Sequence, residues 1–340
     1  GPWWTWTGST FSAVSVNWLA SNNTASGWPG GSYGQEITWS TGSIVLQSNY
    51  QYVIRVRGVD KAGNTGTEGT QVSFVYDVSA PTATVVLPAS GGKYRTLSVM
   101  SGVSTDTWHG VPERVELYIQ NIGPGGAPGQ YYTGSGWSTE IGLSTETAGI
   151  TFNIWASSWS YVKTPEPWVS GNKYAVYAKG RDRAGNWQNV WTAGISSSVF
   201  IVDTDSPSSN VSWPVNPSVN QTTLSTLSGT AADSPSGGGK YNAGLTTTGN
   251  GKVNIVMYDK TGLTYWTGGD WIGSAPSTVT AAAVTGVDLS VWEYVNITGL
   301  VSEHEYEVRL WSADDLGNEE NNTYPGTAKY SFYCDTTAPV

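Results

Sequence analysis

The sequence YEVRLWSADDLGN, at residues 306–318, decides the fold class. Apolar residues alternate with polar ones behind the leading tyrosine, which is typical of a β-strand with one buried face. Asp314 then stands three residues before Gly317, a spacing that is typical of a type I turn. The same pattern occurs as YVIRVRGVDKAGN at 52–64 and as YAVYAKGRDRAGN at 174–186. The three copies predict an all-β chain.

A second motif closes each copy. It reads DVSAP at 77–81, DTDSP at 203–207 and DTTAP at 335–339. The leading tyrosines are separated by 122 residues (174 − 52) and 132 residues (306 − 174), which is the size of a domain rather than of a solenoid repeat. We therefore predict tandem β-sandwich domains in a linear array, with boundaries at 1–80, 81–206 and 207–340.

The first copy is shorter at its N-terminal side than the other two. The later copies begin with the strand-like segments TATVVLP at 82–88 and SNVSWP at 209–214, and the first copy has no counterpart. Three explanations stay open. The natural chain continues upstream, a neighbouring chain donates the missing strands, or the boundary is arbitrary.

With these motifs in view, the chain resembles the bacterial immunoglobulin-like and fibronectin type III-like repeat modules of giant extracellular or cell-surface proteins. The tyrosine-led segment is similar to the penultimate strand of such a sandwich. The resemblance implies that Tyr52, Tyr174 and Tyr306 are tyrosine-corner residues, whose hydroxyls bond to the backbone upstream. It also implies that the Asp-x-x-x-Pro segment is the last strand end and the linker to the next module.

Composition and charge exclude several classes of protein. The formal net charge of −10 argues against nucleic acid as a partner, and no apolar run of about 18 residues predicts membrane insertion. The only histidines, His109 and His304, fall at unmatched places, and the sequence contains no phosphate-binding loop, nucleophile elbow or Cys/His metal spacing. We predict that the chain is not an enzyme and needs no organic cofactor.

Calcium at the module junctions is the one cofactor that the repeats suggest. Aspartate and asparagine oxygens recur in both motifs, and Asp60, Asn64 and Asp77, or their equivalents, are expected to meet near a junction. The alternative is that each aspartate only caps its own turn. The candidate ligands are Asp60, Asn64, Asp77, Asp182, Asn186, Asp203, Asp205, Asp314, Asn318 and Asp335.

The 18 tryptophans suggest a second kind of site, because flat aromatic rings stack on sugars. Trp6, Trp137, Trp266 and Trp271 recur at matched positions, which favours packing within the module. Segments 153–161 and 288–295 are expected to be irregular crossings that place Trp292 and Trp155 or Trp159 in the core. The tryptophans without repeat partners are the candidate glycan platforms: Trp28, Trp168, Trp187 and Trp191.

These observations favour a non-catalytic structural and adhesive spacer of a large bacterial extracellular or cell-surface protein. Its partners would be neighbouring modules of the same long chain or identical chains, and surface glycans. One alternative is the subunit of an extracellular filament or sheath that assembles by strand complementation between chains. Another is a carbohydrate-binding accessory module.

Overall fold

A computed structural model of the chain describes residues 5–6, 11–12, 22–23, 39–40, 43–60, 62–107, 112–139, 150–153, 157–214, 220–221, 223–233, 241–320 and 327–338. Every regular element in these residues is a β-strand, so the fold class is all-β. Among them, no helix long and apolar enough to cross a membrane is present. Trp28 and Trp155 lie outside the described residues.

The chain divides into two compact units. The first contains residues 1–79, 106–110 and 183–186, and its described strands pair into three two-stranded antiparallel sheets. These strands are β1 (Thr5–Trp6) with β2 (Phe11–Ser12), β3 (Asn22–Asn23) with β4 (Trp39–Ser40), and β5 (Tyr50–Ile54) with β6 (Val72–Tyr76).

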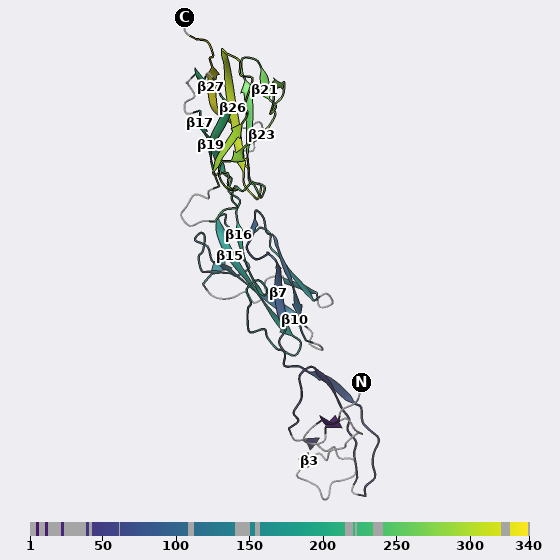
Figure 1. Ribbon diagram of the computed structural model, residues 1–340. Helices are drawn as coiled ribbons and strands as arrows, with labels where there is room; N and C mark the ends of the chain where they lie inside the picture. Colours follow the sequence, from purple (N-terminus) through teal and green to yellow (C-terminus); the bar gives the residue numbers. More distant parts are fainter. Residues whose placement is uncertain are drawn as a thin grey trace. The chain divides into compact units, whose positions relative to one another are not determined.

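The second unit contains the rest of the chain and begins with two sheets that pack on one another. The larger has the order β12-β11-β10-β15-β16-β8 and the smaller the order β13-β14-β9-β7. Figure 1 labels β10, β15 and β16 of the larger sheet and β7 of the smaller. One hydrophobic cluster takes residues from both sheets, among them Leu117 and Trp159. The strands are β7 (Thr82–Leu87), β8 (Gly92–Tyr94), β9 (Val99–Thr105), β10 (Pro112–Asn121), β11 (Tyr131–Tyr132), β12 (Trp137–Ser138), β13 (Ile150–Asn153), β14 (Ser158–Val162), β15 (Asn172–Asp182) and β16 (Ser197–Val202).

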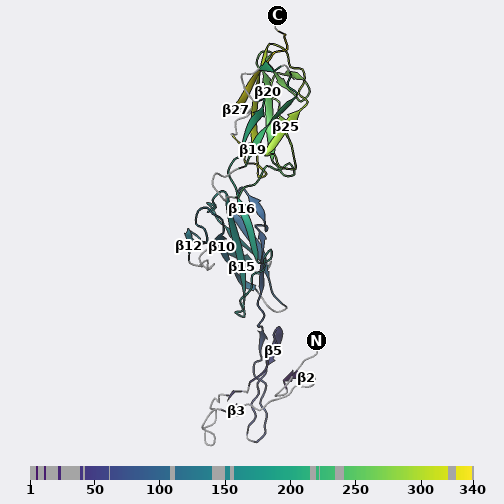
Figure 2. The ribbon, with the colours of Figure 1, turned by 60° about the vertical axis from the view of Figure 1, so that its left-hand side comes forward.

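The C-terminal part of the second unit repeats this arrangement with its own core. A seven-stranded sheet has the order β18-β27-β26-β20-β21-β22, with β23 also paired to β20, and a four-stranded sheet has the order β17-β19-β25-β24. Figure 2 labels β20 and β27 of the first sheet and β19 and β25 of the second. A separate hydrophobic cluster joins these two sheets. The tandem linear arrangement of three domains stays a prediction. The strands are β17 (Ser208–Trp213), β18 (Asn220–Gln221), β19 (Thr226–Ala232), β20 (Lys252–Asp259), β21 (Thr264–Trp266), β22 (Trp271–Gly273), β23 (Val279–Thr280), β24 (Ala282–Ala283), β25 (Val291–Val295), β26 (His304–Ala313) and β27 (Thr327–Cys334).

In each of the two cores of the second unit, a buried tryptophan packs over a glycine of the neighbouring strand. Trp159 on β14 is opposite Gly102 on β9, and Trp292 on β25 is opposite Gly229 on β19. Both tryptophans are buried. A Cβ at Gly229 would lie 2.5 Å from Cζ2 of Trp292, so only glycine leaves room for the indole. The prediction that Trp159 and Trp292 lie in the core is confirmed, but the expected irregular crossings are the regular paired strands β14 and β25.

The tryptophans that recur at matched positions also pack in the same way in the second and third copies, which both belong to the second unit. The Trp137 ring stacks on Tyr174 at a centroid distance of 5.6 Å, and the Trp271 ring lies 4.8 Å from Tyr306. Trp266 is 1% exposed. These contacts account for Trp137, Trp266 and Trp271 as packing residues.

The tyrosine that leads each repeated strand bonds to the backbone upstream. In all three copies, the hydroxyl oxygen accepts the N–H of the residue five positions earlier. Tyr174 and Tyr306 are buried, and burial raises the pKa of Tyr306 to about 12. This is the geometry of a tyrosine corner. The donors are Gln47 for Tyr52, Val169 for Tyr174 and Val301 for Tyr306, each at 2.8 Å.

Removing one such hydroxyl should destabilise the second unit. Tyr306→Phe leaves the partly buried N–H of Val301 without its acceptor, so we expect the free energy of unfolding to fall by about 1 to 2 kcal/mol. Chemical denaturation monitored by tryptophan fluorescence measures this. Tyr333→Phe is the matched control, because its hydroxyl bonds the exposed Glu303 and its loss should cost less than about 0.5 kcal/mol. Equal effects of the two variants would contradict this role.

Candidate metal centre

The Asp-x-x-Gly-Asn segments form the same turn in the first and third copies. The carboxylate of Asp314 accepts the backbone N–H of Asn318 at 2.8 Å and its side-chain amide at 2.6 Å. The carboxylate of Asp60 accepts the corresponding groups of Asn64 at 2.7 and 2.8 Å. Gly317 has a φ of +78°, which glycine adopts without strain. The aspartate therefore caps its own turn, whether or not it has a further role.

The asparagine of the turn also reaches the closing motif of the preceding copy. The side-chain nitrogen of Asn318 donates to the backbone carbonyl of Asp203 at 3.1 Å, within the second unit. Within the first unit, the side-chain nitrogen of Asn186 donates to the carbonyl of Asp77, also at 3.1 Å. One hydrogen bond thus recurs at equivalent positions of the repeat.

The structure corrects which motifs meet. Asp60, Asn64 and Asp77, or their equivalents, were expected to meet near a module junction. The side chains of Asp60 and Asn64 are exposed and bond each other, whereas the carboxylate of Asp77 accepts the N–H of Ser79. The reason is the antiparallel pairing of the two strands that carry the motifs, as in β15 and β16. The turn follows the first strand and the Asp-x-x-x-Pro motif follows the second, so the two lie at opposite ends of the sheet.

Three aspartates of the second unit instead form one group. Asp203, Asp233 and Asp314 are all buried, and one carboxylate oxygen from each lies within 4.8 Å of the others. Sequence reasoning missed Asp233. The signal that could have identified Asp233 is its position in the repeat. It directly follows β19, and Asp106 occupies the equivalent position directly after β9.

Backbone donors hold these side chains in place. Asp203 Oδ2 accepts the N–H of Ala243 at 2.6 Å, and Asp233 Oδ2 accepts the N–H of Gly244, also at 2.6 Å. The loop at 243–244 therefore orients two of the three carboxylates. A carboxylate oxygen that accepts one N–H keeps a lone pair for a second partner.

Two polar atoms at this group have no hydrogen-bond partner among the described residues. They are Oδ1 of Asp233 and Oδ1 of Asn318, in side chains that are 8% and 2% exposed. The ammonium of Lys93 donates to the carbonyl of Ala243 and forms no ion pair with the trio in the described residues. Buried polar atoms and buried negative charges both need a partner, so the group is suited to accept a cation.

The electrostatics agree with the geometry. Burial raises the pKa of Asp233 to about 6, with the charges of Asp203 and Asp314 acting in the same direction and Lys93 against it. Burial also raises the pKa of Asp203, and the charge of Asp314 adds to that shift. Three ionised carboxylates at this spacing repel one another unless a proton or a metal ion intervenes.

The donor set fits calcium better than magnesium. Calcium binds six to eight oxygens at about 2.3 to 2.6 Å, so two oxygens on one ion lie at most about 5 Å apart. The 4.8 Å limit within the trio meets that requirement. Magnesium usually keeps several waters, which suits a buried all-protein site less well.

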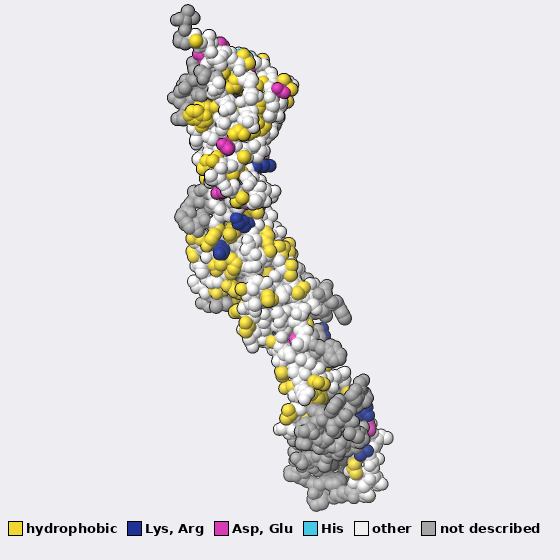
Figure 3. All heavy atoms as spheres, viewed as in Figure 1, with side chains coloured by type: hydrophobic (Ala, Val, Ile, Leu, Met, Phe, Trp, Pro, Cys, Tyr) yellow, Lys and Arg dark blue, Asp and Glu magenta, His cyan; other side chains and the backbone are white. Residues whose placement is uncertain are grey.

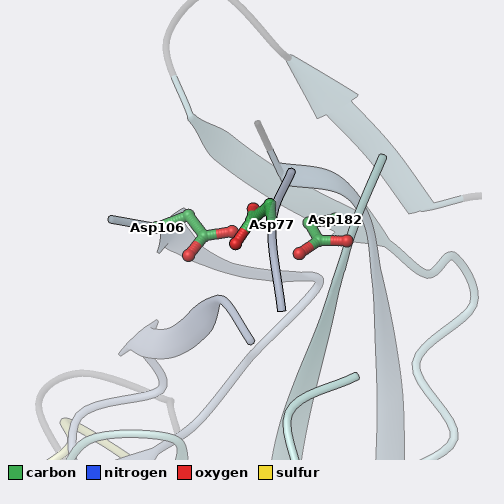
Figure 4. A group of neighbouring side chains, drawn as sticks. All are labelled: Asp77, Asp106 and Asp182. Atoms are coloured by element: carbon green, nitrogen blue, oxygen red, sulfur yellow. The ribbon is translucent and has the colours of Figure 1, made fainter. Parts of the chain in front are cut away.

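Figure 4 draws three further aspartates. Asp77 and Asp106 belong to the first unit, and their carboxylates lie near one another, whereas Asp182 belongs to the second unit. These three aspartates do not all belong to one unit, whereas Asp203, Asp233 and Asp314 do, so the candidate site consists of the latter three.

The remaining predicted ligands have local roles. Asp335 accepts the N–H of Thr337 at 2.9 Å, as the equivalent Asp77 accepts that of Ser79, also at 2.9 Å. Asp205 donates its N–H to Asp203 Oδ1 and so helps to orient that carboxylate.

Among the candidate glycan platforms, Trp168 is packed rather than free. Its indole N–H donates to the carbonyl of Leu97 at 2.7 Å, and its ring lies 5.1 Å from Tyr174 and 5.4 Å from Phe200. These contacts hold the partly buried ring against the core, and its role as a glycan platform stays a prediction. Trp187 and Trp191 lie together on another face, which is described below.

The raised pKa of Asp233 predicts a pH dependence of stability in metal-free buffer. Its folded pKa of about 6 lies above the unfolded value near 4, so ionisation costs more in the folded state. The free energy of unfolding should therefore fall by up to about 3 kcal/mol as the pH rises from 4 to 6, and change little above that through this group. Denaturation of wild type and Asp233→Asn isolates this contribution. Parallel pH profiles of the two proteins would contradict it.

The fold and the site define the class of protein only as an all-β chain of several sheets with an acidic group in its second unit. No protein-family model and no curated protein matches the sequence. A crystal structure of Drosophila N-cadherin EC1-4 is a structural neighbour, with a TM-score of 0.28 and 11% sequence identity. That match covers 88% of this chain and 61% of the cadherin chain, so the chain spans less than two thirds of its neighbour.

Proposed function

We propose that the chain is a non-catalytic structural and adhesive spacer of a large bacterial extracellular or cell-surface protein. In this proposal the modules stand in a linear array, and calcium at Asp203, Asp233 and Asp314 fixes the third copy to the end of the second. The observation that carries the proposal is that three buried carboxylates, two of them from the repeated motifs, gather where the Asn318 turn bonds the carbonyl of Asp203.

The mechanism is mechanical. Asp203 comes from the closing motif of the second copy, whereas Asp233 and Asp314 come from the third, so an ion bound by all three joins the two copies directly. Further contacts support the same joint, since Lys93 donates to the carbonyl of Ala243 and Arg95 to that of Gly317. A joint held in this way transmits force with little bending.

Electron microscopy of the purified chain tests this function. In calcium we expect elongated particles whose second and third copies keep a constant angle, and in chelator a wider range of angles. Compact particles in both conditions would contradict the spacer. End-to-end polymers that form only in calcium would favour the filament instead.

A further inference from the structure

The outer face of β10 and β15 carries a row of aromatic and basic side chains. The register pairs Arg114 with Arg181, Glu116 with Lys179, and Tyr118 with Tyr177. Since successive side chains of a strand alternate between faces, and Val115 and Leu117 are in the core, these pairs lie on the opposite, outward face.

An exposed tryptophan stands over the tyrosine pair. Trp191 is 45% exposed, and its ring centroid lies 5.6 Å from those of both Tyr118 and Tyr177. The interplanar angles are 73° and 58°, so the two tyrosines support the indole from the sheet without covering it as a parallel stack would. The result is a fixed aromatic ring that is open to solvent.

Three cations gather beside this platform. Arg114, Lys179 and Arg181 lie 4.9, 4.9 and 5.5 Å from the centroid of the Trp187 ring. Arg114 pairs with Glu116 and Arg181 with Glu113, each at 3.4 Å, whereas Lys179 has no ion pair among the described residues. Among these five side chains, Lys179 therefore leaves one positive charge in excess, in a chain whose net charge is −10. Figure 3 shows one face of the molecule, on which the charged side chains are few and scattered.

Packing alone explains Trp187, whose ring covers the basic side chains, but it leaves Trp191 half open. Val190 beside it is 70% exposed. Tyr177, which supports the Trp191 ring, and Lys179 are two residues apart on one strand, so their Cα atoms are about 7 Å apart and their side chains leave the same face of the sheet. An apolar ring face next to a lone cation matches a sugar ring that bears a carboxylate.

We propose that this outer face of β10 and β15 binds an acidic polysaccharide. A pyranose ring stacks on Trp191, and a carboxylate of the same or the next sugar pairs with Lys179. The proposal gives the adhesive part of the proposed function a ligand class and rests on that function, but it does not depend on the calcium site.

Affinity electrophoresis of the full chain in chelator tests this proposal. A polyuronate in the gel should retard the wild-type protein, whereas neutral dextran should not. Trp191→Ala should weaken binding at least about tenfold. Lys179→Gln, which leaves the aromatic cluster intact, should weaken it about threefold to tenfold and reduce its salt dependence. The matched controls Trp213→Ala, at a tryptophan that is 47% exposed on β17, and Lys252→Gln should bind as wild type does.

Each other outcome overturns the proposal. If the polyuronate does not retard the wild-type protein, the chain has no such site. If dextran retards the protein equally, the charge of the polysaccharide plays no part in binding. If Trp191→Ala and Lys179→Gln both bind the polyuronate as wild type does, the binding site does not lie on this face. Polyglutamate binding of the same strength would assign the effect to charge alone. Because these gels contain chelator, their result does not depend on whether the chain binds calcium. Glycan binding in the gels is likewise no evidence for the calcium site.

Discussion

Saturating calcium is expected to raise the unfolding temperature of the second unit by about 5 to 10 °C. A ligand at about 100 times its dissociation constant stabilises the folded state by about 2.7 kcal/mol, and each kcal/mol corresponds to about 2 to 4 °C in a domain of this size. The gain arises because the ion neutralises three buried carboxylates that otherwise repel one another. Differential scanning calorimetry in calcium and in chelator measures the shift.

Two variants separate this site from unspecific calcium effects. Asp233→Asn should abolish most of the shift, and in chelator it should melt at or above the wild-type temperature, since it removes one of the repelling charges. Asp60→Asn is the matched control, because Asp60 makes the same turn in an exposed position and should leave the shift unchanged. A calcium shift that survives Asp233→Asn would place the ion elsewhere.

Gly229→Ala is expected to destabilise the second unit by about 3 kcal/mol. The new methyl group would fall inside the contact distance of the carbonyl oxygen of Asn210 and 2.5 Å from the Trp292 ring. Neither neighbour can yield easily, because the first is backbone of the paired strand β17 and the second is a buried indole. The unfolding temperature should fall by about 6 to 12 °C.

A second glycine provides the comparison. Gly269 has no atoms near the position of an added Cβ, so Gly269→Ala should change the unfolding free energy by less than about 0.5 kcal/mol. If Gly229→Ala melts as the wild type does, the tryptophan and glycine contact does not determine how the two sheets pack.

The repeated motifs predicted strands and turns well because their signals are local. A tyrosine followed by alternating residues specifies a half-buried strand, and an aspartate three residues before a glycine specifies its turn. The absence of helical periodicity likewise agreed with a fold whose described elements are all strands. Such patterns depend only on residues that are close together in the sequence, so they can be recognised without knowing the tertiary structure.

The site depended on contacts that no local pattern contains. Asp233 lies in an ordinary polar segment, and only the pairing of β19 in its sheet brings it to Asp203 and Asp314. The same limit explains Trp168, whose Pro-rich loop suggested exposure although its ring packs on Tyr174. Strands β14 and β25 were missed because each has only five residues, so the alternation in SWSYV and VWEYV is too short to separate a strand from an irregular segment.

The most direct measurement is an anomalous-scattering crystal structure of the chain grown in calcium. The account predicts a calcium peak between Asp203, Asp233 and Asp314, coordinated by Asp233 Oδ1 and by an oxygen from each of the other two. An ordered structure without that peak, in which protons or waters join the three carboxylates, would contradict it.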